Sequence, residues 1–320
     1  MRQLLFLGAV LALAGCAQQP VPLGEPGAPR PTSGVFAFQT AGSLVRSADG
    51  SMLVLGPPLT LSGELRLPEG SGPFPAVILA HGCGGQPVYT ELAWGRTLRE
   101  WGYATFVVDS FSARGVINVC SNALPLLPTQ RVPDAYGALR LLAANPKIDP
   151  KRIALMGFSH GGALTMVAST AWAKETFAPP GQPAFRAFFP FYPFCNPIFP
   201  ERDHVSAPVR IHTGAADDWT PAAPCAELAA SLKASGQDVA INVYPNAYHA
   251  FDQAASYEYM PSAGNGAGCF PKMASVLGPM RRLDDPVPKC VTRGATIGPN
   301  AQARADAERN LHAQLDELLK

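Results

Sequence analysis

The sequence predicts an α/β protein with a mostly parallel central sheet flanked by helices. Short β-branched or apolar runs recur along the chain, and helix-like segments separate them. The chain has 320 residues, 47% of them hydrophobic and 15% charged, so it can bury a substantial core. The formal net charge of +1, without a dense Lys or Arg run, gives no electrostatic footprint for nucleic acid or an acidic partner.

Six runs are predicted to be strands. "LSGELRLP", from Leu61, alternates in a way that is typical of an edge strand with one wet face, whereas "AVILAHG" and "ATFVVDS" hold apolar stretches expected at the sheet centre. The other three runs are "RIALMG", "VRIHTG" and "VAINVYP". Helices are expected over residues 91–101, 133–144 and 222–234, from His160 onward, and in the amphipathic stretch that closes the chain.

The N-terminal residues are interpreted as an export signal. Residues 1–16 contain one early Arg, an apolar run too short for a permanent membrane span, and small residues before Cys16. The ending "LAGC" resembles the lipobox of bacterial lipoproteins, which implies that Cys16 is lipidated and anchors the protein to a membrane. The alternative is an ordinary cleaved signal. Ala17 slightly favours an outer-membrane anchor facing the periplasm over inner-membrane retention.

Three regions are expected after the signal. Residues 17–34 are rich in Pro, Gly and polar residues and predict an extended tether. Residues 35–320 predict a single domain, with a Gly- and Pro-rich insertion around 253–300. A long stretch of this kind inside a compact domain is usually functional or specially constrained, and a Cys269–Cys290 bridge would constrain it.

The cysteine count indicates disulfides. With Cys16 assigned to lipid, six cysteines remain, and an even number in an exported chain favours three bridges over free buried thiols. None of them forms a CxxC motif. The candidates are Cys83, Cys120, Cys195, Cys225, Cys269 and Cys290.

"GFSHGG" suggests that Ser159 is a nucleophile. A G-x-S-x-G after a strand and before a helix forces the serine onto a tight turn, with its hydroxyl exposed above the sheet. The alternative is a structural glycine turn. A serine needs a base, and the base needs an acid, in the chain order Ser, acid, His. Asp217 and His249 follow the next suitable strands at the same sheet edge. Asp218 as the acid and His249 as a packed loop residue remain alternatives.

Five motifs in order resemble the dienelactone hydrolase family of the α/β-hydrolase superfamily: "AHGCGG", "VVDSFSARG", "GFSHGG", "GAADDWTP" and "YPNAYHAFD". The resemblance implies the α/β-hydrolase fold, with Ser159 as nucleophile, His249 as base and Asp217 as the acid of the G-x-x-D-x-x-x-P loop. It also implies that the backbone N–H groups of Cys83 and His160 form an oxyanion hole. Arg114 is a candidate for the family's substrate-binding arginine, or forms a surface salt bridge.

The chain also departs from the family's pattern. The namesake enzymes carry Cys where this chain has Ser159, and a Glu expected near the site falls in "HGCGG", so dienelactone itself is not the expected substrate. Cys83 and Cys120 follow neighbouring strands and are expected to pair, although Cys83 as a second nucleophile is an alternative. Cys195 and Cys225 could pair in the same way and pin the acid-bearing loop.

These observations predict a lipid-anchored, exported serine hydrolase that cleaves small-molecule or polymeric carboxylic esters. No cofactor is expected, and the absence of H-x-H and H-E-x-x-H spacing argues against a catalytic metal. A peptidase, an acyltransferase or a non-catalytic cell-envelope binding protein are the alternatives, and the oligomeric state is left open. Phe158 and Trp219 are candidates for a pocket that takes aromatic esters or polyester chains. "RAFFPFYPF" predicts either a hydrophobic acyl pocket or a buried strand.

Overall fold

The computed structural model describes residues 33–320 except 86, 254 and 279–285. The predicted signal, the lipidation site Cys16 and nearly all of the predicted tether therefore lie outside the described residues. Among the helices of the described part, none combines the length and the apolar character that crossing a membrane requires.

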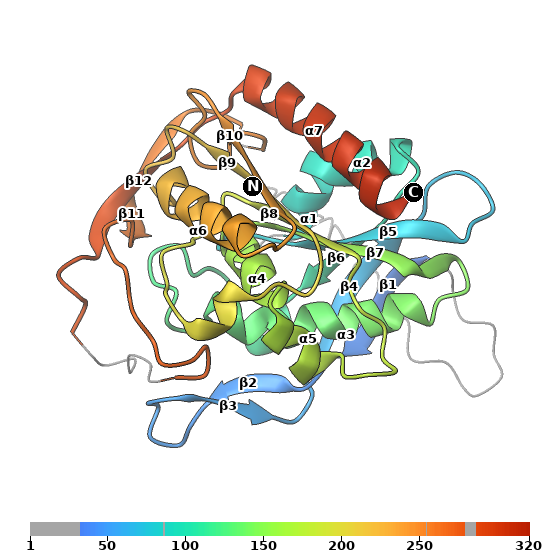
Figure 1. Ribbon diagram of the computed structural model, residues 1–320, viewed down its shortest axis with the longest axis horizontal. Helices are drawn as coiled ribbons and strands as arrows, with labels where there is room; N and C mark the ends of the chain where they lie inside the picture. Colours follow the sequence, from blue (N-terminus) through green and yellow to red (C-terminus); the bar gives the residue numbers. More distant parts are fainter. Residues whose placement is uncertain (1–32, 86, 254, 279–285) are drawn as a thin grey trace, which may run out of the picture.

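An eight-stranded sheet forms the centre of the described structure (Figure 1). The strand order is β1-β4-β6-β5-β7-β8-β9-β10, and all pairs from β6 to β10 are parallel. β4 runs antiparallel to both β6 and β1. The strands are β1 Gly34–Gln39, β4 Thr60–Arg66, β5 Phe74–Ala80, β6 Ala104–Asp109, β7 Ile148–Phe158, β8 Ala187–Phe191, β9 Val209–Gly214 and β10 Val239–Tyr244.

All six predicted strands are present, but one of them has a different place. β4 was expected at the sheet edge and instead lies second from it, because β1 pairs along its outer side with Phe38 opposite Leu61. β1 has no strong sequence signal, since four of its six residues are only half-buried. "RAFFPFYPF" contributes the fully buried strand β8, so of its two interpretations the buried strand is the one found.

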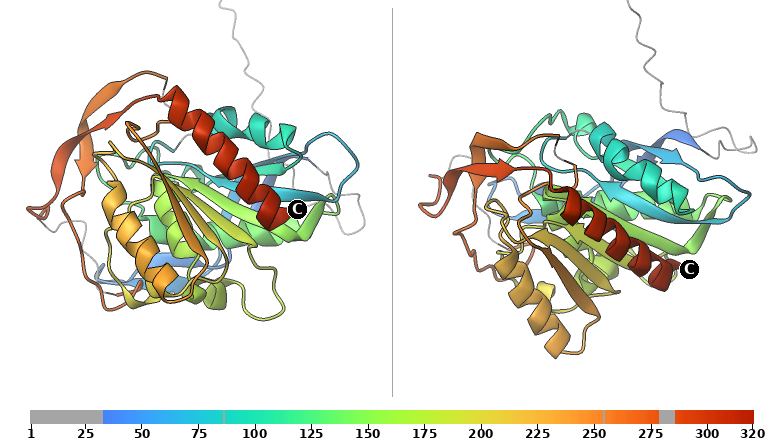
Figure 2. Two further views of the ribbon diagram at one scale, coloured as in Figure 1. Left: turned by 45° about the horizontal axis from the view of Figure 1, so that its top comes forward. Right: turned by 90° about the horizontal axis from the view of Figure 1, so that it is seen from above.

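Helices cover both faces of the sheet (Figure 2). On one face, α3, α4, α5 and α6 enclose the larger core cluster; on the other, the α1–α2 segment and α7 enclose the second cluster. The expected helix over 91–101 is found as α1, a π-helical turn and α2, and α5 was not predicted. The bounds are α1 Pro87–Thr90, π-turn Glu91–Gly95, α2 Arg96–Glu100, α3 Val132–Ala143, α4 His160–Ala168, α5 Ala171–Phe177, α6 Ala222–Ala234 and α7 Ala301–Leu319.

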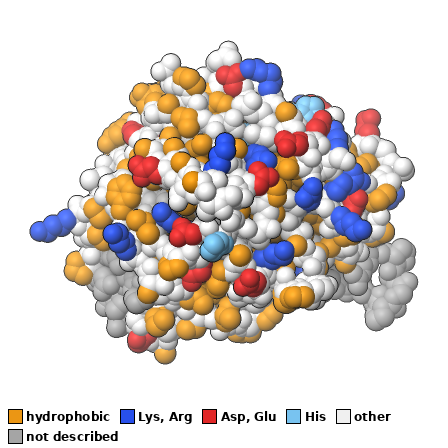
Figure 3. Space-filling model, in the orientation of Figure 1, with side chains coloured by type: hydrophobic (Ala, Val, Ile, Leu, Met, Phe, Trp, Pro, Cys, Tyr) orange, Lys and Arg blue, Asp and Glu red, His pale blue; other side chains and the backbone are white. Residues whose placement is uncertain are grey.

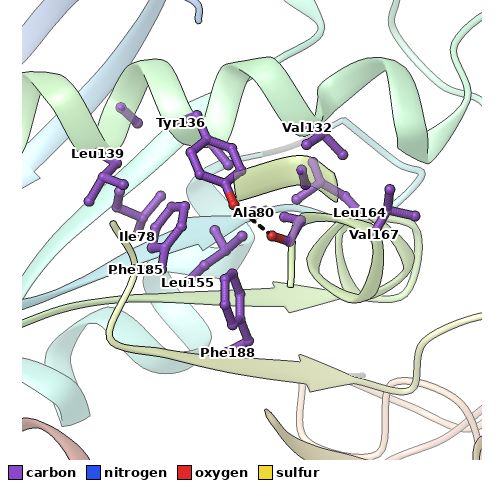
Figure 4. Packing of buried hydrophobic residues seen from close by; sticks show 14 of the residues in the cluster. Ile78, Ala80, Val132, Tyr136, Leu139, Leu155, Leu164, Val167, Phe185 and Phe188 are labelled. Atoms are coloured by element: carbon purple, nitrogen blue, oxygen red, sulfur yellow. Dashed lines mark hydrogen bonds between the residues drawn. The ribbon is translucent and has the colours of Figure 1, made fainter. Parts of the chain in front are cut away.

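The core holds α4 firmly against the sheet (Figure 4). Leu164 of α4 packs with Ile78 and Leu155 of the central strands, and all three side chains are buried. The Tyr136 hydroxyl of α3 donates a hydrogen bond of 2.8 Å to the Ala168 carbonyl at the end of α4, which satisfies its buried polar group. The helix that follows Ser159 is therefore fixed by packing on both its flanks.

Two hairpins lie outside the main sheet. β2 (Ser43–Arg46) pairs with β3 (Leu53–Gly56), and β11 (Glu258–Asn265) pairs with β12 (Thr292–Ile297) in the expected insertion. The β11–β12 hairpin lies at one end of the molecule, in orange and red at the left of Figure 1. Neither hairpin was predicted from the sequence.

Three disulfides confirm the expected pairings. They join Cys83 to Cys120, Cys195 to Cys225, and Cys269 to Cys290. Such bridges are typical of extracellular or periplasmic proteins, because oxidising compartments preserve them. Lys and Arg side chains are interspersed with Asp and Glu on the face shown in Figure 3.

Candidate active site

Ser159 occupies the turn between β7 and α4 in a conformation that is unusual for a residue with a side chain. Its φ is 54° and its ψ −111°, outside the usual regions, and its N–H donates to the Phe191 carbonyl at 2.9 Å. Backbone strain of this kind costs about 1–3 kcal/mol and persists where the surroundings over-determine it. Here the strain follows from a strand that passes directly into a buried helix.

The glycines on either side of Ser159 are required by close backbone contacts. A Cβ on Gly157 would lie 2.1 Å from the Gly161 carbonyl oxygen, and a Cβ on Gly161 would lie 2.1 Å from the Ala80 carbonyl oxygen. Real Cβ atoms do not approach so closely, so each position excludes larger residues. The G-x-S-x-G spacing is thus explained by the approach of the first turn of α4 to the ends of β5 and β7.

Ser159, His249 and Asp217 lie in one hydrogen-bonded row. His249 Nε2 is 2.8 Å from Ser159 Oγ, and His249 Nδ1 is 2.8 Å from Asp217 Oδ2. Because a carboxylate only accepts, Nδ1 carries the proton that it donates to Asp217, and Nε2 is left to accept from the Ser159 hydroxyl. Three loops at the carboxyl ends of β7, β9 and β10 converge in this row, as expected from the chain order.

The structure distinguishes the two adjacent aspartates. Asp217 Oδ1 accepts hydrogen bonds from the backbone N–H groups of Trp219 (2.9 Å) and Thr220 (2.8 Å), which turns Oδ2 toward His249. Asp218 points elsewhere and accepts from the N–H and the hydroxyl of Thr296 on β12, both at 2.8 Å. Asp217 is therefore the aspartate that forms the hydrogen bond with His249, and Asp218 binds the insertion through Thr296.

Thr220 is a member of the site that the sequence analysis missed. Its hydroxyl lies 3.0 Å from Asp217 Oδ2 and 3.1 Å from His249 Nδ1. A threonine three residues after an aspartate is a common turn pattern, which offered only a weak signal in advance.

The two segments that carry the expected oxyanion donors both border Ser159. The His160 N–H belongs to the first turn of α4, where N–H groups have no partner within the helix. The loop that carries Cys83 reaches the same place, since a Cβ on Gly82 would lie 3.6 Å from Ser159 Cβ. This loop is held by the Cys83–Cys120 disulfide and by a 2.9 Å bond from the Val119 N–H to the Cys83 carbonyl. The disulfide also removes the thiol that a second nucleophile would need.

The side chain of His160 is held neutral. Burial and, to a smaller extent, the positive charge of Arg131 together lower its pKa to about 3. Its Nδ1 accepts from Arg131 at 2.8 Å, so Nε2 carries the proton that is donated to the Leu126 carbonyl at 2.9 Å. Although it is next to Ser159 in sequence, this histidine is already committed to other partners.

Two of the three proposed substrate-binding residues require correction. Arg114 gives both terminal nitrogens to the carboxylate of buried Asp134, each at 2.8 Å, so its guanidinium is not available to an anionic substrate. Phe158 is 1% exposed and packs against Phe191 and Tyr192, because both faces of the central strand β7 are covered by core clusters. It therefore lines no pocket for an ester.

Trp219 does lie beside the site. Its ring centroid is 4.9 Å from that of His249, and its indole N–H donates to the Gly264 carbonyl of β11 at 2.9 Å. It packs with Ala263 and Ala295 of the hairpin, and the partly buried Met260 and Ile297 adjoin this cluster. The β11–β12 hairpin thus forms a wall next to His249, and the Cys269–Cys290 disulfide links the two ends of the segment that connects its strands.

The strand order and the serine turn define the class of protein: this is an α/β-hydrolase. The chain belongs to the dienelactone hydrolase family, whose model matches residues 61–268. That range contains Ser159, Asp217 and His249 together with the oxyanion loop.

Three similar proteins illustrate the relationship. Esterase EstD of Thermotoga maritima is 27% identical over 130 residues, which are 38% of this chain and only 31% of that protein. A dienelactone hydrolase-like promiscuous phosphotriesterase from metagenomic libraries has a TM-score of 0.56 at 18% identity, covering 90% of this chain and 100% of that one. Thermogutta terrifontis esterase 2, phosphoramylated by tabun, has a TM-score of 0.50 at 17% identity and covers 71% and 88%. The two solved structures support the fold.

Proposed function

We propose that this protein is a serine hydrolase that cleaves carboxylic esters through an acyl-enzyme intermediate. One observation carries the proposal: His249 lies 2.8 Å from both Ser159 Oγ and Asp217 Oδ2, with Ser159 on a strained turn. Membership of the dienelactone hydrolase family supports ester chemistry, and the name of the EstD relative agrees with it.

The proposed reaction has two halves, acylation of Ser159 and hydrolysis of the acyl-enzyme, and the same catalytic groups act in both. His249 Nε2 takes the Ser159 proton while Oγ attacks the ester carbonyl, and the Cys83 and His160 N–H groups donate to the oxyanion. The tetrahedral intermediate collapses as His249 protonates the leaving alcohol, which leaves an acyl-serine. Water then attacks that ester with His249 again as base, and collapse releases the acid and restores Ser159. Asp217 orients the imidazole and stabilises its charged form throughout.

The setting of the enzyme is proposed from the sequence together with the disulfides. Cys16 would carry the lipid, residues 17–34 would form the tether, and residues 35–320 the catalytic domain. The three disulfides support export to an oxidising compartment such as the periplasm. An outer-membrane anchor would place the site near ester substrates that enter the cell envelope.

A fluorophosphonate probe tests the proposal, because it reacts with serines that a base has activated. The chain from Ala17 onward, made in an oxidising compartment, should be labelled at Ser159 and should hydrolyse p-nitrophenyl acetate. The reaction of Thermogutta terrifontis esterase 2 with tabun shows that a protein of similar fold accepts a phosphorus electrophile. Ser159→Ala should abolish labelling and turnover, whereas exposed Ser112→Ala should leave both unchanged. A folded, disulfide-intact protein that is not labelled would favour a binding role.

A further inference from the structure

Arg131 is a buried cation that contacts both segments of the proposed oxyanion hole. It ends the 3-10 turn Pro128–Arg131, just before α3, and its side chain has no measurable exposure. Most arginines in proteins keep the guanidinium in water because desolvating a charge is costly.

One guanidinium nitrogen of Arg131 joins two separate parts of the site. Nη1 donates to the His81 carbonyl at 2.9 Å and to His160 Nδ1 at 2.8 Å. His81 lies two residues before Cys83 in the oxyanion loop, and His160 begins α4. The two hydrogens of Nη1 therefore connect the loop with one proposed donor to the helix start with the other.

The remaining guanidinium nitrogens are stabilised only from beyond hydrogen-bond distance, by the negative charges of Asp134 and Asp109. Nε and Nη2 have no hydrogen-bond partner among the residues that the structure describes. Asp134, three residues along the chain, gives both oxygens to Arg114 instead. The ring of Phe111, 5.1 Å from the guanidinium carbon, offers a weaker cation–π contact. Burial accordingly lowers the pKa of Arg131 to about 9, a value that still leaves it charged at neutral pH.

A buried charge without an anionic partner at contact distance is destabilising in the resting protein. The first turn of α4 adds partial positive charge in the same region. The buried guanidinium charge and the partial positive charge of the helix both become less unfavourable when negative charge develops next to the Cys83 and His160 N–H groups. An arrangement that is unfavourable at rest and favourable with an oxyanion is what transition-state stabilisation requires.

We propose that Arg131 is a positioning residue for the oxyanion hole, which sets the Cys83 and His160 N–H groups at the separation that a tetrahedral oxyanion needs. It acts through the His81 carbonyl and the His160 ring and does not itself contact the substrate. This inference rests on the proposed ester hydrolysis. It also explains why "GFSHGG" has a histidine after Ser159: its neutral ring presents the acceptor that Arg131 binds.

The experiment compares Arg131→Met and Arg131→Lys with the wild type on a matched pair of substrates, an ester and its thionoester. A thionoester places sulfur in the oxyanion hole, where hydrogen bonds to N–H donors are weaker, so the ester-to-thionoester ratio of kcat/KM reports on the hole itself. Arg131→Met should lower kcat for the ester about 100-fold, the order of losing one oxyanion donor, with KM changed less than about threefold. The ratio should fall at least about tenfold. Arg131→Lys should give an intermediate ratio, because its ammonium can still donate hydrogen bonds in this region but lacks the fixed geometry of the guanidinium.

Arg140→Met is the matched control, since Arg140 lies on α3, the helix that directly follows Arg131, and donates to the backbone carbonyl of Thr40, away from Ser159 and His249. It should leave the ratio unchanged. Equal losses of kcat/KM on both substrates in folded Arg131→Met, which would leave the ratio unchanged, would overturn the inference. If Arg131→Met does not fold, an unchanged ratio in Arg131→Lys overturns it. A wild type without esterase activity would instead contradict the proposed function itself.

Discussion

Replacing Asp217 by asparagine should change which nitrogen of His249 carries the proton. Asp217 Oδ1 is held by the N–H groups of Trp219 and Thr220, so the amide oxygen takes that position and the amide NH2 takes the position of Oδ2. The NH2 then donates to His249 Nδ1, which lies 2.8 Å away. Nε2 must carry the ring proton in this tautomer, and it can no longer accept a proton from Ser159.

The expected loss is large because the nucleophile keeps its place but loses its base. In a serine protease the same replacement lowers kcat about 10⁴-fold, equivalent to about 5.5 kcal/mol of transition-state stabilisation. We expect a loss of this order in kcat for p-nitrophenyl acetate at neutral pH, with native melting behaviour. The rate of fluorophosphonate labelling should fall in parallel, since it depends on the same base.

Asp218→Asn is the matched control for this replacement. Asp218 contacts Thr296 on β12 and makes no contact with His249, so the change weakens at most one or two hydrogen bonds. We expect activity within about threefold of wild type and a stability loss of about 1 kcal/mol. A comparable loss of activity in both variants, or Asp217→Asn activity within tenfold of wild type, would refute the reasoning.

Three further predictions concern packing, the insertion and pH. Gly161→Ala should lower both the melting temperature and kcat, because its Cβ would meet the Ala80 carbonyl oxygen at 2.1 Å; Gly268→Ala, whose nearest contact is 3.7 Å, should be neutral. Replacing Cys269 and Cys290 by Ser, which opens a loop with a sequence separation of 21, should cost up to about 3 kcal/mol in denaturant unfolding, and no change would show that the bridge is redundant. Burial lowers the pKa of His212 to about 3, so below about pH 6.5 the unfolded chain binds a proton that the folded protein does not. Its contribution to the free energy of unfolding is therefore complete above pH 6.5 and falls by about 1.4 kcal/mol per unit as pH decreases toward 3. His212→Gln should reduce this slope and His312→Gln, at a partly exposed site on α7, should not; equal slopes would contradict the assignment.

Strand and motif positions were predictable because they depend on local sequence. Central strands such as β5 read as apolar runs, and the serine turn needs glycines at fixed offsets. β1 and the two hairpins were missed, since their residues are partly exposed and they form only by pairing with strands elsewhere in the chain. The place of β4 was wrong for the same reason: its alternation indicates a wet face but not how many neighbours it has.

For the site, the sequence by itself determined the order of Ser159, the acidic pair and His249 along the chain, and the cysteines available for bridges. Only the tertiary structure decided that Asp217 and not Asp218 meets His249, since adjacent residues in a turn point in different directions. It also decided that Phe158 is buried, that Arg114 binds Asp134, and that Arg131 spans the oxyanion loop and α4. Residue type limits the chemistry a side chain can perform, but its partners are set by contacts between segments far apart in the chain.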